Sequence, residues 1–200
     1  TLQGEGARTG RPSVFCRFTG CNLWSGREKD RSTAVCNFCD TDFVGVDGPG
    51  GGKFINALEL SDAIESFWPN EESNKYVVFT GGEPGLQLDK NVVDHLHLKN
   101  FEVAVETNGT LDLPLNIDWL TVSPKADSTL KIRRGNELKL VYPQENVFPN
   151  SFEDLDFEIF YLQPMDNEDK DKNTQRTIQY CLENPKWKLS LQTHKYMGIA

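Results

Sequence analysis

Short apolar runs recur along the chain, and their length and alternation are typical of β-strands. In residues 13–18, alternation places Cys16 on one face of a strand and Arg17 on the opposite face. The run at residues 75–80 (KYVVFT) predicts a buried strand. Similar runs predict further strands at residues 101–106, 117–122, 136–142, 157–162 and 188–191.

Three segments between these runs show the spacing or composition of helices. Residues 56–68 predict a helix that begins after an N-cap at Asn56 and stops at Pro69. Residues 88–99 predict a second helix, and residues 172–184 predict a third, polar one. Strands that alternate with helices or short crossovers predict a parallel α/β sheet.

Other stretches lack either pattern. Residues 126–135 and 143–156 look irregular, so we expect some crossover helices to be short or replaced by loops. Residues 1–6 (TLQGEG) have the character of the tail of a first strand, which predicts that a native N-terminal segment is missing. Polar residues follow several strand ends, where barrel and open-sheet enzymes place their sites.

Composition narrows the class of protein. A length of 200 residues predicts one domain, and the net charge of −9 argues against binding to nucleic acid. We see no apolar run of membrane-spanning length and no signal peptide, so no membrane association is expected. Five cysteines, an odd number, indicate metal ligation in a reducing compartment rather than a disulfide framework. A cytoplasmic location is therefore predicted.

The most specific chemistry lies in the loop 21–41, with Cys21, Cys36 and Cys39 spaced C-x14-C-x2-C. Three thiolates on a four-iron cluster leave one iron open for a ligand, whereas four thiolates close a site. Cys16 is the alternative fourth ligand and would give a structural zinc spacing, but it lies inside an apolar strand. Cys181, on the polar C-terminal helix, is expected to be a bystander.

The cysteine loop GCNLWSGREKDRSTAVCNFCDT, followed by TGGEP at residues 80–84, resembles the radical S-adenosylmethionine (SAM) superfamily. In particular it is similar to the 7-carboxy-7-deazaguanine synthase family. The similarity extends over nearly the whole chain, through TLQGEG, ETNG, VSPKA, NELK, QPMD and QTHKY. It implies a single domain over residues 1–200, folded as an incomplete TIM-like barrel of about six parallel strands with reduced helices, with the cluster loop after the first complete strand.

The resemblance also implies a reaction and its cofactors. The three cysteines would hold a [4Fe–4S] cluster, and SAM bound to the open iron would yield a radical that takes a hydrogen from C6 of 6-carboxy-5,6,7,8-tetrahydropterin. Ring contraction and loss of ammonia would give 7-carboxy-7-deazaguanine, a precursor of deazapurines such as queuosine. The family requires Mg²⁺ and is generally a homodimer. An electron donor such as flavodoxin or ferredoxin is implied.

Residues that match the family's motifs are expected to bind SAM. Glycines at a strand end let backbone approach a ligand, and a carboxylate such as Glu83 suits the SAM ammonium, although a plain turn would explain the same residues. The expected SAM-binding residues are Phe38, Asp40, Gly82, Glu83, Glu106, Asn108, Ser123, Lys125, Gln163, Pro164, Met165 and Asp166.

The substrate and Mg²⁺ are assigned by the same resemblance. The paired polar groups of Gln3 and Glu5 suit a pterin edge, and the Arg17 guanidinium suits a carboxylate, with a surface ion pair as its alternative. The expected substrate-binding residues are Leu2, Gln3, Gly4, Glu5, Arg17, Thr80, His194 and Ala200. Thr41 is the candidate Mg²⁺ ligand, with a turn or helix cap as the alternative.

Two other functions stay open at this point. The first is a non-catalytic zinc module with Cys16 as fourth ligand. The second is a radical SAM activase that acts on a partner protein, for which an apolar docking face would be expected. The acidic net charge argues against direct action on tRNA.

Overall fold

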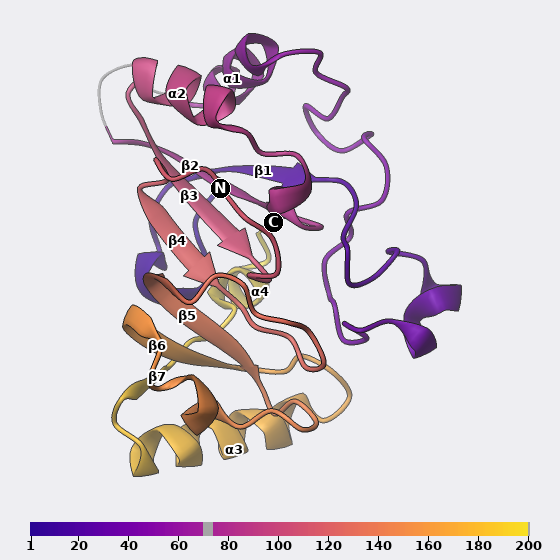
Figure 1. The fold of residues 1–200 in the computed structure, drawn as a ribbon, viewed down its shortest axis with the longest axis vertical. Coiled ribbons are helices and arrows are strands. Elements are labelled where there is room, and N and C mark those ends of the chain that lie inside the picture. The colour runs from indigo at the N-terminus through magenta and orange to yellow at the C-terminus, as the bar shows by residue number, and fades with distance from the viewer. Residues whose placement is uncertain (70–73, 200) are drawn as a thin grey trace.

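The computed structural model of the chain describes residues 1–69 and 74–199. Seven strands form one sheet in which every neighbouring pair is parallel and the spatial order follows the chain order (Figure 1). The strands are β1 (Val14–Phe18), β2 (Lys75–Gly81), β3 (Phe101–Thr107), β4 (Trp119–Val122), β5 (Arg134–Tyr142), β6 (Asp156–Pro164) and β7 (Trp187–Leu189). In this order β1 and β7 are the two edges, so the sheet is an open, incomplete barrel.

Few helices connect these strands. They are α1 (Ala57–Ser66), α2 (Lys90–Leu98), α3 (Lys170–Glu183) and the short α4 (Thr193–Met197), with 3-10 turns at Gly6–Arg8, Glu28–Thr33, Pro84–Leu86 and Pro149–Phe152. The predicted N-cap Asn56 is confirmed, because its side chain accepts a hydrogen bond from the Glu59 backbone N–H. Within the described residues, no helix is both long and apolar enough to cross a bilayer.

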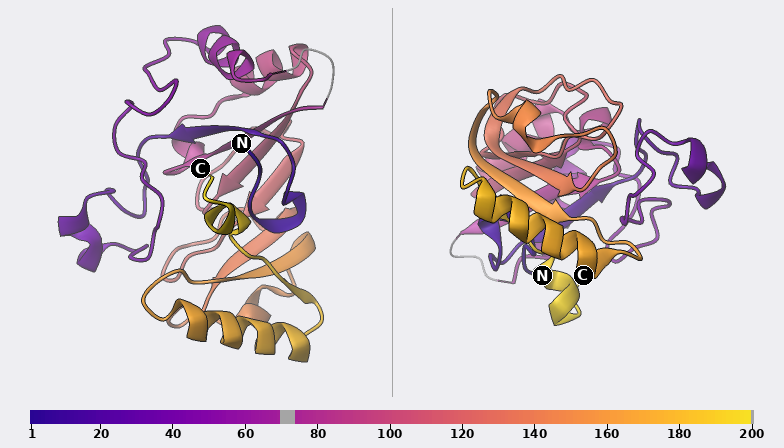
Figure 2. Two further views of the ribbon diagram at one scale, coloured as in Figure 1. Left: turned by 180° about the vertical axis from the view of Figure 1, so that it is seen from behind. Right: turned by 90° about the horizontal axis from the view of Figure 1, so that it is seen from below.

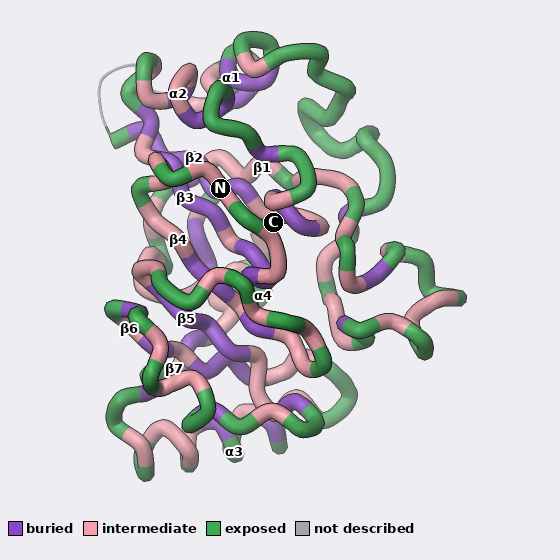
Figure 3. The backbone as a smooth tube through the Cα atoms, in the orientation of Figure 1, coloured by how far each residue is buried: buried purple, intermediate pink, exposed green. Residues whose placement is uncertain are grey.

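Two apolar clusters hold the helices to one face of the sheet. In the first, α1 and α2 pack on β2 and β3, where Val77, Phe79, Val93 and Leu96 are fully buried. In the second, α3 lies beside β5 to β7, and Leu140 and Leu162 carry no exposed surface. Figure 3 shows the buried residues concentrated along the strands. This burial explains the continuous apolar runs that predicted parallel strands.

The N-terminal segment covers the opposite face of β2 to β4. Arg8 lies over the Trp119 ring at 4.1 Å and Arg11 lies over the Tyr76 ring at 3.8 Å. Both guanidinium groups also pair with Glu102, at 3.0 and 2.6 Å. Strands β2 to β4 are therefore covered on both faces, and the contacts of Arg8 and Arg11 lie at the amino ends of these strands.

The strand pattern of the sequence is confirmed, with shifts of a few residues at the ends. Residues 143–155, between β5 and β6, contain the 3-10 turn Pro149–Phe152 and an isolated bridge but no longer helix or strand, as the irregular sequence predicted. The prediction that residues 1–6 are a strand tail is wrong: Leu2 makes only an isolated antiparallel bridge to Pro12. Left-handed backbone at Gly6 (φ 62°) and Gly10 (φ 86°) turns the chain back, which ends any strand there.

The 3-10 turns and α4 were not predicted, and two of these elements lie in segments that border the site. The 3-10 turn Glu28–Thr33 lies within the cysteine loop, which projects away from the sheet (Figure 2). Helix α4 lies beside the N-terminal segment, because the Thr193 N–H donates to the Gly4 carbonyl at 2.9 Å. The two ends of the chain thus meet beside the carboxyl ends of the strands.

Candidate functional site

A cavity of about 420 Å³ opens at the carboxyl ends of β1 to β6. The N-terminal segment, the cysteine loop and α4 complete its wall. A volume of this size suits a cofactor together with a small substrate group. The position agrees with the rule that parallel sheets bind ligands where their strands end.

Nearly all of the predicted site residues line this one cavity. They are Leu2, Gln3, Gly4, Glu5, Arg17, Cys21, Cys36, Phe38, Cys39, Asp40, Thr41, Thr80, Gly82, Glu106, Asn108, Ser123, Lys125, Gln163, Pro164, Met165, Asp166 and His194. Glu83 is not among the lining residues. The prediction for Ala200 falls outside the described residues.

The cysteines divide as the strand pattern predicted. Cys21, Cys36 and Cys39 line the cavity, whereas Cys16 packs against the α1–α2 core and Cys181 against the α3 core. Burial raises the pKa of the Cys16 thiol to about 12, which opposes metal binding as a thiolate. A hydrogen bond from Cys36 lowers the pKa of Cys39 to about 6, so one thiol of the pair readily becomes a thiolate.

The three cavity cysteines fit an iron–sulfur cluster better than a single ion. Among residues 1–69 and 74–199, no group of three or more His, Cys, Asp or Glu side chains is arranged to hold one metal ion. A four-iron cluster does not need that arrangement, because each cysteine bonds a different iron. The absence of Cys16 from the cavity leaves three thiols there, which argues against the four-ligand zinc module.

Arg31 holds the cysteine loop together. Its Nη1 donates to the carbonyl oxygens of Asn37 and Cys39, at 3.0 and 3.1 Å, and so fixes the backbone of the C-x2-C pair. The guanidinium also lies over the Trp24 ring at 4.1 Å, and Trp24 packs edge-on against Phe43. Contacts of Arg31 therefore fix the long segment between Cys21 and Cys36 against the backbone around Cys39.

The two glycines at the end of β2, Gly81 and Gly82, have a structural reason that the sequence did not reveal. A Cβ at Gly82 would overlap the Gly20 carbonyl, and a Cβ at Gly81 would overlap Phe18 backbone. The Gly82 N–H donates to Phe18 O and the Glu83 N–H to Gly20 O, each at 2.8 Å. The glycines thus fix the chain directly before Cys21.

Glu83 is fully buried, and its carboxylate is satisfied within the protein. Oε1 accepts from Thr107 Oγ1 at 2.7 Å and from the Gly85 N–H at 2.8 Å, and Oε2 accepts from the Asn108 N–H at 2.8 Å. Glu83 therefore joins the loop after β2 to the loop after β3 and positions Asn108, which does line the cavity.

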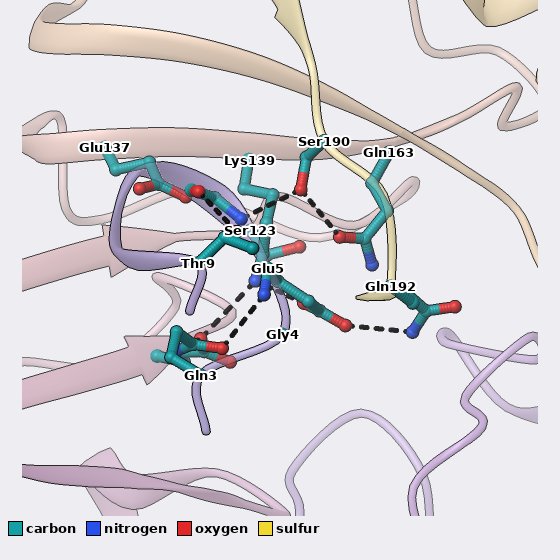
Figure 4. Close-up of polar contacts among 12 residues, drawn as sticks. Gln3, Gly4, Glu5, Thr9, Ser123, Glu137, Lys139, Gln163, Ser190 and Gln192 are labelled. Atoms are coloured by element: carbon teal, nitrogen blue, oxygen red, sulfur yellow. Dashed lines mark hydrogen bonds and ion pairs between the residues drawn. The ribbon is translucent and has the colours of Figure 1, made fainter. Parts of the chain in front are cut away.

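The N-terminal segment meets the sheet through a buried polar network (Figure 4). Gln3 donates to Glu106 Oε1 at 2.9 Å, and Lys139 pairs with Glu5 and lies 3.4 Å from Glu106 Oε1. Burial alone would raise the pKa of Glu5, but the Lys139 charge and hydrogen bonds from Lys139 and Gln192 lower it to about 2. Glu5 is therefore a carboxylate at neutral pH.

The segment around α4 supplies residues that the sequence did not single out. Gln192 Nε2 donates to Glu5 Oε1 at 2.9 Å and to Asp40 Oδ2 at 3.0 Å. Lys195 binds Asp40 at 2.6 Å and also pairs with Asp166. Lys139 lies within the NELK motif and Gln192 within QTHKY. Their shared partner Glu5 is far away in the sequence, so no local pattern indicated that they contact it.

Arg17 and Thr41 differ from their alternative interpretations. Among the ion pairs of the described residues Arg17 takes part in none; its guanidinium lies 5.2 Å from the Phe15 ring centroid and lines the cavity. No helix of the described chain begins or ends next to Thr41, so Thr41 does not cap one, and the alternative of a turn cap is not tested. Both side chains are thus placed to meet a ligand.

The wall of the cavity near the cysteines carries a lysine, Lys125. Lys125 Nζ donates to the carbonyl and hydroxyl oxygens of Ser123, each at 2.7 Å. Burial lowers the pKa of Lys125, partly offset by the neighbouring Cys36 and Cys39. A buried ammonium beside the cysteines can bind a carboxylate of a ligand there.

An open parallel sheet with three cysteines at the cavity formed by its strand ends defines the radical SAM class of enzymes. Relatives named 7-carboxy-7-deazaguanine synthase from Caulobacter vibrioides and Bradyrhizobium diazoefficiens are 58% and 59% identical over 199 residues, covering 100% of this chain and 95% of each relative. The crystal structure of QueE from Escherichia coli matches with a TM-score of 0.67 at 25% identity, over 97% of this chain and 91% of that one. No protein-family model matches. The chain belongs to the 7-carboxy-7-deazaguanine synthase family.

Proposed function

We propose that this chain converts 6-carboxy-5,6,7,8-tetrahydropterin to 7-carboxy-7-deazaguanine and ammonia as a Mg²⁺-dependent radical SAM lyase of deazapurine biosynthesis. One observation carries the proposal: the three cysteines and the polar N-terminal segment with Gln3 and Glu5 line the same cavity. A cluster-bound cofactor and a heterocyclic substrate can therefore meet there.

Cys21, Cys36 and Cys39 would hold a [4Fe–4S] cluster with one open iron. When bound, the cluster and SAM supply hydrogen-atom abstraction from the substrate, chemistry that belongs to the cofactors. The buried Lys125 ammonium would bind the SAM carboxylate, and Asn108 would orient the sugar. The other SAM-binding residues are Phe38, Asp40, Gly82, Glu106, Ser123, Gln163, Pro164, Met165 and Asp166. Glu83 would act indirectly, by holding Asn108 in place.

The substrate would lie between the N-terminal segment and β1. The acceptor-only carboxylate of Glu5 matches the N–H donors of a pterin edge, and the Arg17 guanidinium matches the substrate carboxylate. Leu2, Gln3, Gly4 and Thr80 complete the pocket. His194 lies against Gly4, where a Cβ would overlap its ring, so glycine is required for this approach. Thr41 would offer its hydroxyl to Mg²⁺.

Three features of the biological unit belong to the same proposal. The reductant would be a flavodoxin or ferredoxin, the location would be cytoplasmic, and the enzyme would be a homodimer. The support for all three is the resemblance to the family.

The test is anaerobic. The protein is reconstituted with iron and sulfide, reduced, and given SAM, Mg²⁺ and 6-carboxytetrahydropterin, and 7-carboxy-7-deazaguanine is followed by mass spectrometry. We expect Cys21→Ala to abolish product and Cys16→Ser to retain it, because Cys21 lines the cavity and Cys16 does not. A brown protein that cleaves SAM without making product would overturn the substrate assignment. A colourless zinc protein that requires Cys16 would overturn the radical chemistry.

A further inference from the structure

We propose that Lys139 is a positioning residue that holds the Glu5 carboxylate in the orientation in which it receives the N–H edge of the pterin. The inference rests on the proposed function and adds a residue from the middle of the sheet to the substrate site. Lys139 has no place among the residues that the sequence motifs assign to substrate, cofactor or metal.

The geometry places Lys139 in contact with Glu5 on the wall of the cavity, which both residues line. Its side chain is 5% exposed and rises from β5, and its ammonium contacts Glu5 Oε2 and lies 3.4 Å from Glu106 Oε1. Gln192 holds the other oxygen of Glu5 from the opposite side, at 2.9 Å. Both carboxylate oxygens are thus anchored, and each keeps lone pairs that a ligand in the cavity lined by Glu5 can use.

Lys139 also provides the nearest positive charge in a crowded acidic region. The Glu5, Glu106 and Glu137 carboxylates all act on it, and burial raises the pKa of Glu137. The charged or titratable groups that face Glu5 come from several segments. They are Lys139 and Glu137 from β5, Glu106 from β3, His194 from α4 and Asp40 from the cysteine loop. Buried carboxylates gathered in this way need a cation to remain ionised.

Loss of that cation would change the chemistry of Glu5 itself. Burial raises the pKa of Glu5, and without Lys139 the neighbouring carboxylates would raise it further. A protonated Glu5 presents an O–H donor towards the N–H donors of the ring, so substrate binding would weaken. The wild-type pKa of about 2 keeps Glu5 ionised throughout the neutral range. In the variant the pKa of Glu5 would be higher, so the protonated fraction of Glu5 would be larger at lower pH.

The first experiment measures KM for 6-carboxytetrahydropterin from pH 6 to pH 9 in the holoenzyme. We expect Lys139→Met to raise KM about 10-fold or more at pH 6, the size of effect expected when a charged hydrogen-bond partner is lost. The KM of the variant divided by that of the wild type should then fall as the pH rises and Glu5 becomes ionised. The ratio cancels the titration of the substrate. Lys139→Arg keeps the charge and should restore most of the affinity. The matched control is Lys188→Met, an exposed lysine on β7.

A double-mutant cycle separates positioning from mere structural support. In a Glu5→Gln background there is no carboxylate to hold, so Lys139→Met should add about twofold or less to KM if the two residues act as one unit. Effects that multiply, or a KM ratio that does not vary with pH, would overturn the inference. If Lys139→Met does not fold, as judged by thermal melting and iron content, Lys139→Gln replaces it in the same measurements.

The wild-type enzyme distinguishes this inference from the proposed function. If wild-type holoenzyme makes no 7-carboxy-7-deazaguanine, the proposed function fails. If it makes product while neutral variants at Lys139 keep the wild-type KM at every pH, the proposed function stands and the role of Lys139 is wrong.

Discussion

At the scale of single residues, Gly82 shows how an absent side chain fixes the site. Its backbone lies against that of Gly20, directly before Cys21, and a Cβ would overlap the Gly20 carbonyl oxygen. Because the obstacle is backbone rather than a flexible side chain, either β2 or the start of the cysteine loop would have to move. The position of the cysteine loop therefore depends on the close contact between Gly82 and Gly20, which involves no polar side chain.

We expect Gly82→Ala to lower the free energy of unfolding by about 1–3 kcal/mol, as overpacking does. It should also reduce the iron bound after reconstitution, because the chain before Cys21 is displaced. Chemical denaturation and iron analysis measure the two effects. Gly48→Ala is the matched control, since nothing lies within 4 Å of the position its Cβ would take. Unchanged stability and iron content in Gly82→Ala would contradict this role.

At the scale of elements, the cysteine loop has little regular structure and depends on side-chain contacts. Arg31 lies within the 3-10 turn Glu28–Thr33. Its side chain donates to the carbonyls of Asn37 and Cys39, on either side of Phe38. Its planar guanidinium also lies over Trp24. Lysine cannot reproduce both contacts, because an ammonium is a point charge.

Arg31→Met should therefore weaken cluster retention by about 10-fold, in the range found for groups that support metal ligands. Iron and sulfide loss to a chelator under anaerobic conditions measures it. Lys29→Met removes a charge from an exposed position in the same turn and should leave retention unchanged. Equal retention in Arg31→Met and wild type would show that the loop is held by other contacts.

At the scale of the whole molecule, the sheet is the rigid support for a site made from many loops. Leu140 is fully buried in the middle of β5, opposite Leu162 on β6, within the α3 core. Lys139, its neighbour in sequence, points to the site face. A defect in the core of β5 is thus expected to destabilise the whole fold.

Leu140→Ala should cost about 2–5 kcal/mol in the free energy of unfolding, the range for a buried leucine truncated to alanine. Leu115→Ala is the control, because Leu115 is 96% exposed and its loss should change stability by less than about 0.5 kcal/mol. Urea unfolding of both variants measures the difference. Similar unfolding curves for the two variants would contradict the importance of this core.

Much of this arrangement could be predicted from the sequence. The strands are visible as apolar runs, most clearly β2 and β3, because parallel strands covered on both faces need apolar residues at nearly every position. The N-terminal turn and α4 were missed for a physical reason. Residues 1–6 are turned back by glycines, and α4 is a short helix with no buried residue to give it a periodic pattern.

The sequence by itself determined the strand order along the chain, the spacing of the three cysteines and the polar residues that follow the strand ends. Only the tertiary structure decided how those residues share the site: that Glu83 faces inward to hold Asn108, that Lys139 contacts Glu5, and that Gln192 joins Glu5 to Asp40. Local patterns record which face of an element is buried. They carry no information about a contact such as that between Glu5 and Gln192, which are 187 positions apart and meet only when the two ends of the chain fold together.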